Sequence, residues 1–415
     1  MEENSKLNTK IKQKKIKKRK KSKSINLLNK GVQFTNKIIK HDFINNNKIK
    51  KVRNPGIDLV RLLTMYCIVL NHFLCFGNGF NYFYKHKRIL SMIHSFTDWT
   101  NDAFILISGI VGYKTNKYSN LLYLWLTVFF YSVGIHKYIT IFKKGFHVNQ
   151  NTNEQYYPLI FNKYWYFTIY FATYLYLPLI NKGIEHLTKF ELRLVIMSLI
   201  GILVLWRDYK NRKGDIFHFN EGGSIPWFLI FYTTGGYIGK YRIDYSGLKK
   251  FIHCVIYASI FTIVSLIYFK AYIKEFYFTI WNKKMEIPII LRKMLNEYWD
   301  SSLKIIQSIT ICLFFLQIHY NKYIAKIICF FGPLAFGIYL IHENKIIRDN
   351  VMRKLFINQP RNISLNSLLS LLLIKSVKLS LVCLFIDYLR HLLFTFLRIK
   401  KILFFIEAKM KEKFN

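Results

Sequence analysis

The sequence predicts an all-α integral membrane protein, a polytopic bundle of about ten transmembrane helices preceded by a disordered basic N-terminal tail. The chain has 415 residues and a formal net charge of +40, yet 52% of its residues are hydrophobic and 18% are aromatic. Its apolar residues are gathered in blocks of about 20, the length at which a helix crosses a bilayer. The polar segments between these blocks are too short for a soluble catalytic domain. Any chemistry is therefore expected within the bundle or at its edges.

The charge distribution predicts three parts. Residues 1–55 hold 18 Lys or Arg and 3 Asp or Glu, and so carry +15 of the +40. They contain too little apolar surface to offset the entropy of ordering, which predicts a disordered cytoplasmic tail. Residues 56–390 are expected to form the transmembrane domain, and residues 391–415 a basic amphipathic cytoplasmic tail along the membrane surface. The positive-inside rule explains the basic segments, so no nucleic-acid partner is expected.

Ten apolar blocks are candidate spans, taken in order along the chain. They cover residues 57–77, 93–113, 121–142, 164–181, 191–206, 224–239, 251–269, 303–319, 327–342 and 368–386. An even number of crossings, with basic tails at both ends, places both termini in the cytoplasm and the chain in the plasma membrane. The tenth block carries Lys375 and Lys378 in its middle, where a charge is costly. Six cysteines without a C-x-x-C pair predict neither a disulfide framework nor a zinc site.

Charged residues in the first span mark a candidate site, because a charge within a membrane is costly and commonly functional. Arg61 and His72 are eleven residues apart, so they share one helix face about 16 Å apart along the axis. Asp58 lies one turn before Arg61 and can neutralise part of its charge. The alternatives are a packed, hydrogen-bonded histidine and an arginine that extends toward the inner boundary.

Two later blocks add polar groups. His94, Asp98 and Asp102 recur every four residues in the second span, which places them on one helix face before Ser108. Metal binding is less favoured there than a cap or an orienting role for the carboxylates. The ninth span ends in His342, Glu343 and Asn344, level with His72 in the ten-span topology. The alternative for this trio is ordinary interfacial polarity.

Five stretches resemble the acyltransferase type 3 family, membrane enzymes that acylate sugars of cell-surface polysaccharides and related small molecules. The resemblance covers roughly residues 55–395, with the motifs in the family's order. The stretches are Asp58-Leu59-Val60-Arg61 with Asn71-His72, Phe104 to Gly109, Tyr164 to Phe167 with Leu177 to Asn181, Trp227 to Tyr241, and Phe336 to Asn344. The chain departs from the family at Lys114 and Lys117, where many relatives carry an arginine pair.

The resemblance implies transfer of an acyl group, expected to be acetyl, from acyl-CoA to a hydroxyl of a cell-surface glycan. It implies His72 as the catalytic base or nucleophile, and Arg61 with Asp58 for donor binding or charge balance. Acyl-CoA is then a co-substrate, and neither a bound cofactor nor a metal is expected. The residues expected to support His72 are Asn71, Asp102, Ser108, His342 and Glu343, with either Asp102 or Glu343 fixing the imidazole tautomer. The alternative function is a transporter or polysaccharide exporter, although no internal repeat is visible.

Overall fold

The computed structural model describes residues 53–115, 117–142, 153–205, 222–278, 302–356 and 359–414. These residues form helices and connecting turns, with no strand among them, which confirms the all-α class. The chain divides into two compact units, residues 53–400 and a second unit of residues 1–52 with 401–415. Residues 1–52 of the predicted tail are outside the described residues. The predicted domain boundaries stay predictions.

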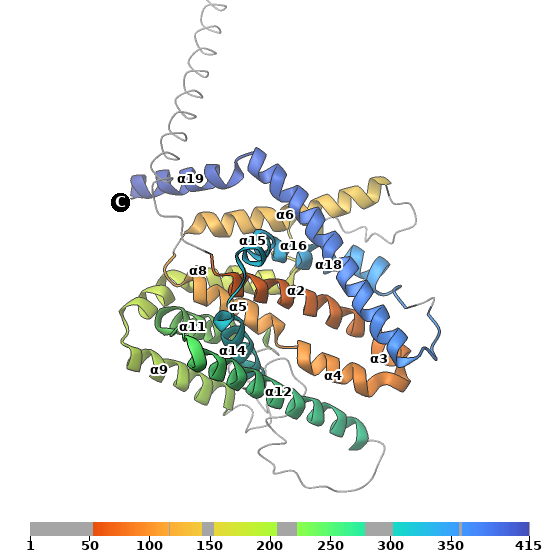
Figure 1. Cartoon of the computed structure of the whole chain (residues 1–415). Helices are drawn as coiled ribbons and strands as arrows, with labels where there is room; N and C mark the ends of the chain where they lie inside the picture. The colour runs from red at the N-terminus through yellow and green to blue at the C-terminus, as the bar shows by residue number, and fades with distance from the viewer. Residues whose placement is uncertain are drawn as a thin grey trace, which may run out of the picture. The chain divides into compact units, whose positions relative to one another are not determined.

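The helices up to the middle of the chain are α2 (Pro55–Cys75), α3 (Gly79–Tyr82), η1 (Tyr84–His86), α4 (Lys87–Thr97), α5 (Thr100–Gly112), α6 (Tyr118–Phe142), α7 (Asn153–Tyr156), α8 (Trp165–His186), α9 (Lys189–Ser198) and η2 (Leu199–Leu205). The later helices are α11 (Ile225–Tyr241), α12 (Gly247–Phe278), α14 (Ser302–Gln317), α15 (Lys322–Phe331), η4 (Gly332–Leu334), α16 (Ala335–His342), α17 (Lys345–Ile347), η5 (Arg348–Met352), α18 (Leu365–Phe396) and α19 (Ile399–Phe414). Within residues 53–400, α2 is central and packs against α4, α5, α14, α15, α16 and α18 (Figure 1).

Five helical segments of the described chain are long and apolar enough to cross a membrane. They are Pro55–Cys75, Tyr118–Phe142, Gly247–Phe269, Lys322–His342 and Leu365–Phe396. The remaining predicted spans coincide with shorter or less apolar helices, such as α14 and α11. An integral membrane protein is thus supported, while the count of ten crossings stays a prediction.

The start of α2 is fixed by local chemistry. The Asn54 side-chain oxygen accepts hydrogen bonds from the amides of Gly56 at 2.9 Å and Ile57 at 3.3 Å. Pro55 occupies the first helical turn, where its missing N–H costs nothing and its φ angle already suits a helix. The helix therefore begins just before Asp58 and carries Arg61 and His72 on one continuous rod.

The second predicted span, 93–113, is wrong as a single helix. Helix α4 ends at Thr97 and α5 begins at Thr100. The Trp99 indole N–H donates to the Phe96 carbonyl at 2.9 Å. At the end of α4, this carbonyl is therefore hydrogen-bonded by a side chain. His94 and Asp98 consequently do not share a helix with Asp102, and the predicted common face does not exist.

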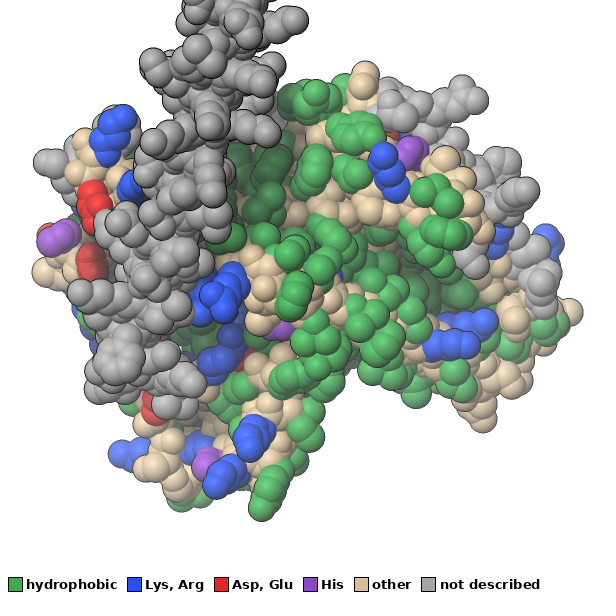
Figure 2. Space-filling view, turned by 90° about the horizontal axis from the view of Figure 1, so that it is seen from above, with side chains coloured by type: hydrophobic (Ala, Val, Ile, Leu, Met, Phe, Trp, Pro, Cys, Tyr) green, Lys and Arg blue, Asp and Glu red, His purple; other side chains and the backbone are tan. Residues whose placement is uncertain are grey.

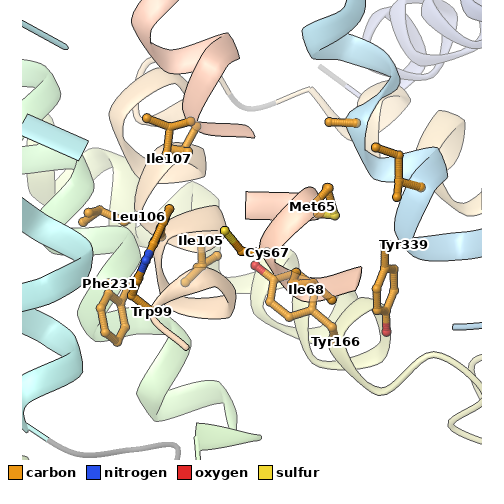
Figure 3. Close-up of a cluster of buried hydrophobic side chains, with 14 of the residues drawn as sticks. Met65, Cys67, Ile68, Trp99, Ile105, Leu106, Ile107, Tyr166, Phe231 and Tyr339 are labelled. Carbon is orange, nitrogen blue, oxygen red and sulfur yellow. The ribbon is translucent and has the colours of Figure 1, made fainter. Parts of the chain in front are cut away.

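Helices α5 and α11 pack with their backbones in contact. A side chain at Gly109 would collide with the Tyr232 carbonyl, and one at Gly235 would collide with the Leu106 carbonyl. Only small residues at these two positions allow the backbones to approach so closely. Apolar side chains from α2, α5, α8, α11 and α16 fill the core around this contact (Figure 3).

A buried ion pair within α18 is hydrogen-bonded to α6. Asp387 accepts two hydrogen bonds from Arg390, both at 2.8 Å, and a third from the Tyr131 hydroxyl at 2.7 Å. A side chain at Gly337 of α16 would meet Asp387 Cβ at 2.5 Å. The glycine of the ninth predicted span therefore lets α16 approach this pair closely.

Candidate active site

The candidate site forms where the last turn of α2 meets the end of α16. His72 Nδ1 lies 3.1 Å from His342 Nε2 and 3.1 Å from Glu343 Oε2. His342 is fully buried, Glu343 is nearly so, and the His72 side chain is 15% exposed. The structure thus brings together three residues that the sequence proposed, although they are 270 positions apart.

Hydrogen bonding fixes where the protons lie. His342 Nδ1 is 2.5 Å from the Ile338 carbonyl oxygen, which can only accept, so Nδ1 carries the proton and Nε2 holds a lone pair. His72 Nδ1 faces that lone pair and the Glu343 carboxylate, both of which are acceptors, so it must carry the proton itself. In the neutral imidazole, His72 Nε2 is then the unprotonated nitrogen and can act as a base or a nucleophile.

Glu343 links His72 to a cation. Its Oε1 accepts a hydrogen bond from Arg348 Nη1 at 2.8 Å, and its Oε2 lies 3.1 Å from His72 Nδ1. Burial raises the pKa of the Glu343 carboxyl, but its hydrogen bond to His72 and the nearby positive charges outweigh this and lower the pKa overall. The Arg348 guanidinium also lies over the Phe76 ring at 4.7 Å. The carboxylate is therefore ionised and held between two donors.

The turn after Glu343 is tied to the start of α8. Asn344 Nδ2 donates to the Tyr164 hydroxyl at 3.0 Å, and that hydroxyl donates to the Leu340 carbonyl at 3.1 Å. Both side chains are fully buried. These bonds fix the turn that presents Glu343 to His72.

Asn71 does not contact the His72 ring. Its side-chain oxygen accepts a hydrogen bond from the Thr97 hydroxyl at 2.7 Å and lies 3.2 Å from His94 Nδ1. Asn71 therefore anchors the end of α4 to α2, beside the site, and supports His72 only through the position of the backbone.

The carboxylates of the second predicted span have other partners. Asp98 pairs with the buried Lys304 of α14 and also accepts a hydrogen bond from Tyr268 at 3.2 Å. Asp102 accepts a hydrogen bond from the Trp227 indole N–H at 2.9 Å. The carboxylate that the structure places next to His72 is therefore Glu343, and Asp102 is not brought to it.

Ser108 lies on α5 and donates to the Phe104 carbonyl at 3.0 Å. It also interacts with Tyr170 of α8. Tyr170 in turn lies close enough to Arg61 for an electrostatic interaction. Ser108 thus belongs to the surroundings of Arg61 rather than to those of His72.

At the other end of α2, Asp58 binds two arginines. Its carboxylate accepts from Arg61 Nη1 at 2.6 Å, and from Arg53 Nε and Nη2 at 2.8 Å and 2.7 Å. One negative charge facing two guanidinium groups leaves an excess of one positive charge. The charge-balancing role expected for Asp58 fits this geometry, and the excess charge favours an anionic ligand.

A family model described as an acyltransferase domain matches residues 54–385, about four fifths of the chain. The chain belongs to the acyltransferase type 3 family. Comparison with curated proteins and with solved structures finds no significant match. The protein is accordingly a membrane acyltransferase, which decides between the two functions considered above in favour of group transfer over transport.

The matched region of this acyltransferase contains Asp58, Arg61, His72 and the whole segment from α15 to η5. Arg348 is the member of the site that sequence reasoning missed. It follows Glu343 by five residues, beyond the end of the predicted span, and carries no helical periodicity signal. The sequence gives one indication of this contact: the acidic Glu343 is followed by the basic Arg348 within about one and a half helical turns.

Donor atoms of His72, His342 and Glu343 lie within 4.8 Å of one another, a spacing that a metal ion can bridge. His72 Nδ1 lies 3.1 Å from both His342 Nε2 and Glu343 Oε2, and the buried Oε2 has no further hydrogen-bond partner in the described structure. The absence of a metal stays a prediction.

Proposed function

We propose that this acyltransferase moves an acetyl group from acetyl-CoA to a hydroxyl of a cell-surface glycan, with His72 as general base. The observation that carries the proposal is the His72–Glu343 contact of 3.1 Å, which leaves His72 Nε2 with a lone pair. An imidazole oriented by a carboxylate is the arrangement by which many enzymes remove a proton from a hydroxyl nucleophile.

The reaction balances with the protein's own groups. His72 Nε2 takes the proton of the acceptor hydroxyl. At the same time, the hydroxyl oxygen forms a bond to the carbonyl carbon of the thioester. The tetrahedral intermediate collapses with cleavage of the carbon–sulfur bond. The imidazolium, stabilised by Glu343, returns its proton to the departing coenzyme A thiolate.

The distance between Arg61 and His72 suits an extended donor. The two residues are about 16 Å apart along α2, so they contact different parts of the same ligand. Tyr170 lies near Arg61, while Tyr339 contacts the His342 ring at 6.3 Å. Tyr166 interacts electrostatically with both Tyr170 and Tyr339, and its ring lies 6.2 Å from that of Tyr339 (Figure 3). Its buried hydroxyl has no hydrogen-bond partner in the described structure. We assign the donor's phosphates to the Arg61 end and its thioester to the His72 end.

The test is release of free thiol from acetyl-CoA by membranes containing the full chain, with and without a mixture of glycans. His72→Ala should abolish acceptor-dependent release, whereas His186→Ala, a change to an exposed histidine at the end of α8, should not. Acceptor-dependent release by His72→Ala at the wild-type rate would refute the assignment. Thiol release without acceptor, together with acetyl transferred to the chain, would instead indicate an acetyl-imidazole intermediate.

A further inference from the structure

A basic surface adjoins the end of α2 that carries His72. It consists of two segments, residues 76–88, which follow α2, and residues 345–361, which follow the Glu343 turn. Together the two segments hold eight Lys or Arg and a single acid, Asp349. We call these two segments the basic rim. Six of its basic side chains are exposed: Lys85, Arg88, Lys345, Arg353, Lys354 and Arg361.

The two segments of the basic rim pack against each other. The Tyr82 hydroxyl donates to the Gln359 carbonyl at 2.7 Å, and the Arg361 guanidinium lies over the Tyr82 ring at 5.7 Å. The Tyr82 ring is also 6.3 Å from that of Phe356. A side chain at Gly77, just past α2, would meet the Phe356 ring at 3.1 Å. The cations of both segments therefore belong to one surface, next to the end of α2.

Arg348 connects the basic rim to His72. Its guanidinium carbon lies 4.7 Å from the centre of the Phe76 ring, and that ring centre lies 4.7 Å from the centre of the His72 ring. The guanidinium is thus no farther from the His72 ring than these two distances together. One N–H of Arg348 binds Glu343, while its buried Nε has no hydrogen-bond partner in the described structure. A glycan with one hydroxyl at His72 can therefore place a charged group of the same or the next sugar beside this cation.

The positive-inside rule does not explain the charge at both ends of α2. The rule collects Lys and Arg on the cytoplasmic side of a membrane. Helix α2 is long and apolar enough to cross a membrane, with Arg53 and Arg61 near its start and the basic rim at its end. Between the two ends, the face to which α6 and α18 contribute is largely hydrophobic (Figure 2). The rule therefore accounts for the cations at one end only, and the basic N-terminal segment assigns it to the Arg53 end.

Excess positive charge next to a catalytic base favours an anionic ligand. Lys85, Lys345 and Arg361 have no acidic partner in the described part of the chain. Like charges on one surface repel each other, and a ligand of opposite charge relieves that repulsion. The donor's phosphates are assigned to the Arg61 end, so the acceptor is the substrate left for the basic rim. We propose that the acceptor is an anionic glycan, with its carboxylates or phosphates on the basic rim and one hydroxyl at His72 Nε2. This assignment rests on the proposed acyl transfer at His72.

The test is the protection of His72 by glycans against diethyl pyrocarbonate, which acylates the unprotonated nitrogen of an imidazole. The purified full chain, in an uncharged detergent, is treated with the reagent alone or together with polygalacturonate, phosphomannan or neutral dextran. Mass spectrometry of the peptide that contains His72 measures the rate of modification. The anionic glycans should slow this rate, and dextran should not. Modification of the exposed His186, at the far end of α8, should proceed equally with every glycan.

Two double variants separate the basic rim from the general positive charge of the chain. Lys345→Gln with Arg361→Gln should raise the concentration of anionic glycan that halves the modification rate about fivefold, as expected for two exposed charge contacts. Lys322→Gln with Lys326→Gln is the matched control, because it removes two exposed charges from α15, which leads into the glycine beside Asp58. It should leave that concentration unchanged. Size-exclusion chromatography and circular dichroism check the folded state of each variant.

Equal protection by dextran and the anionic glycans, no protection by any of them, or equal shifts in the two double variants would overturn the proposal. So would equal protection by a short-chain phosphatidylglycerol, which would assign the basic rim to lipid headgroups. Protection by polygalacturonate alone or by phosphomannan alone would support the proposal and identify the bound group as carboxylate or phosphate. No acetyl group is transferred in these measurements, so a missing thiol release refutes the proposed function separately. Thiol release driven equally well by dextran would instead refute the anionic acceptor while the proposed function stands.

Discussion

The contact between Glu343 and His72 predicts the effect of a single-atom change. In Glu343→Gln, one carboxylate oxygen becomes an amide NH₂. Arg348 can only donate hydrogen bonds, so the remaining amide oxygen should turn toward it. The NH₂ group then faces His72 Nδ1 and donates to it, which moves the imidazole proton to Nε2. The base would be lost although the side chain keeps its size.

The expected loss follows from the value of a correctly protonated base. General-base catalysis contributes about 10²–10⁴-fold to a rate, which corresponds to about 2.7–5.4 kcal/mol of barrier. Glu343→Gln should therefore lower kcat for acetyl transfer at least a hundredfold, while KM for acetyl-CoA should change little because the charges proposed to bind the donor lie at the other end of α2. The assay is thiol release at varied donor concentration, and Glu185→Gln on an exposed position of α8 is the matched control.

The double variant Glu343→Gln with Arg348→Met gives a sharper test of the same reasoning. Without Arg348, the amide is free to flip and present its oxygen to His72 Nδ1. Activity should then rise above that of Glu343→Gln alone. Loss of a general base should cost about 10²–10⁴-fold in rate. A Glu343→Gln rate within about threefold of the wild-type rate would therefore refute the proposed protonation states.

Three further predictions concern stability and metal. Gly337→Ala should destabilise the protein by about 1–3 kcal/mol, since the added Cβ would meet Asp387. Gly134→Ala should stabilise the protein slightly, because no atom lies within 4 Å of the added Cβ. Thermal unfolding in detergent compares the two variants. Burial lowers the pKa of Lys163 to about 7, so the native state binds this proton less tightly than the unfolded state and gains stability as the pH rises above 7. Lys163→Met should therefore show a smaller rise in melting temperature between about pH 7 and pH 9 than the wild type, and an equal rise would contradict the burial. Chelators should leave acyl transfer at His72 unchanged, and activity lost to chelation and restored by zinc would show that the three donor atoms hold a metal.

The sequence by itself determined the all-α class, the class of enzyme and the catalytic candidate. Helical periodicity is local, so the shared face of Arg61 and His72 on α2 followed from their spacing alone. The cost of a charge in a membrane singled out the residues worth considering, among them Glu343. The order of the motifs was enough to indicate the family, which the match over residues 54–385 bears out.

Tertiary structure alone decided which of these residues meet. Periodicity gives the direction in which a side chain points from its own helix, but not which helix packs opposite. The sequence therefore left Asp102 and Glu343 as equal partners for His72. Packing of α16 against α2 selects Glu343, while α11 brings Trp227 to Asp102. Arg348 is outside every periodic segment, and it joined the site only because the turn after α16 folds back over Phe76.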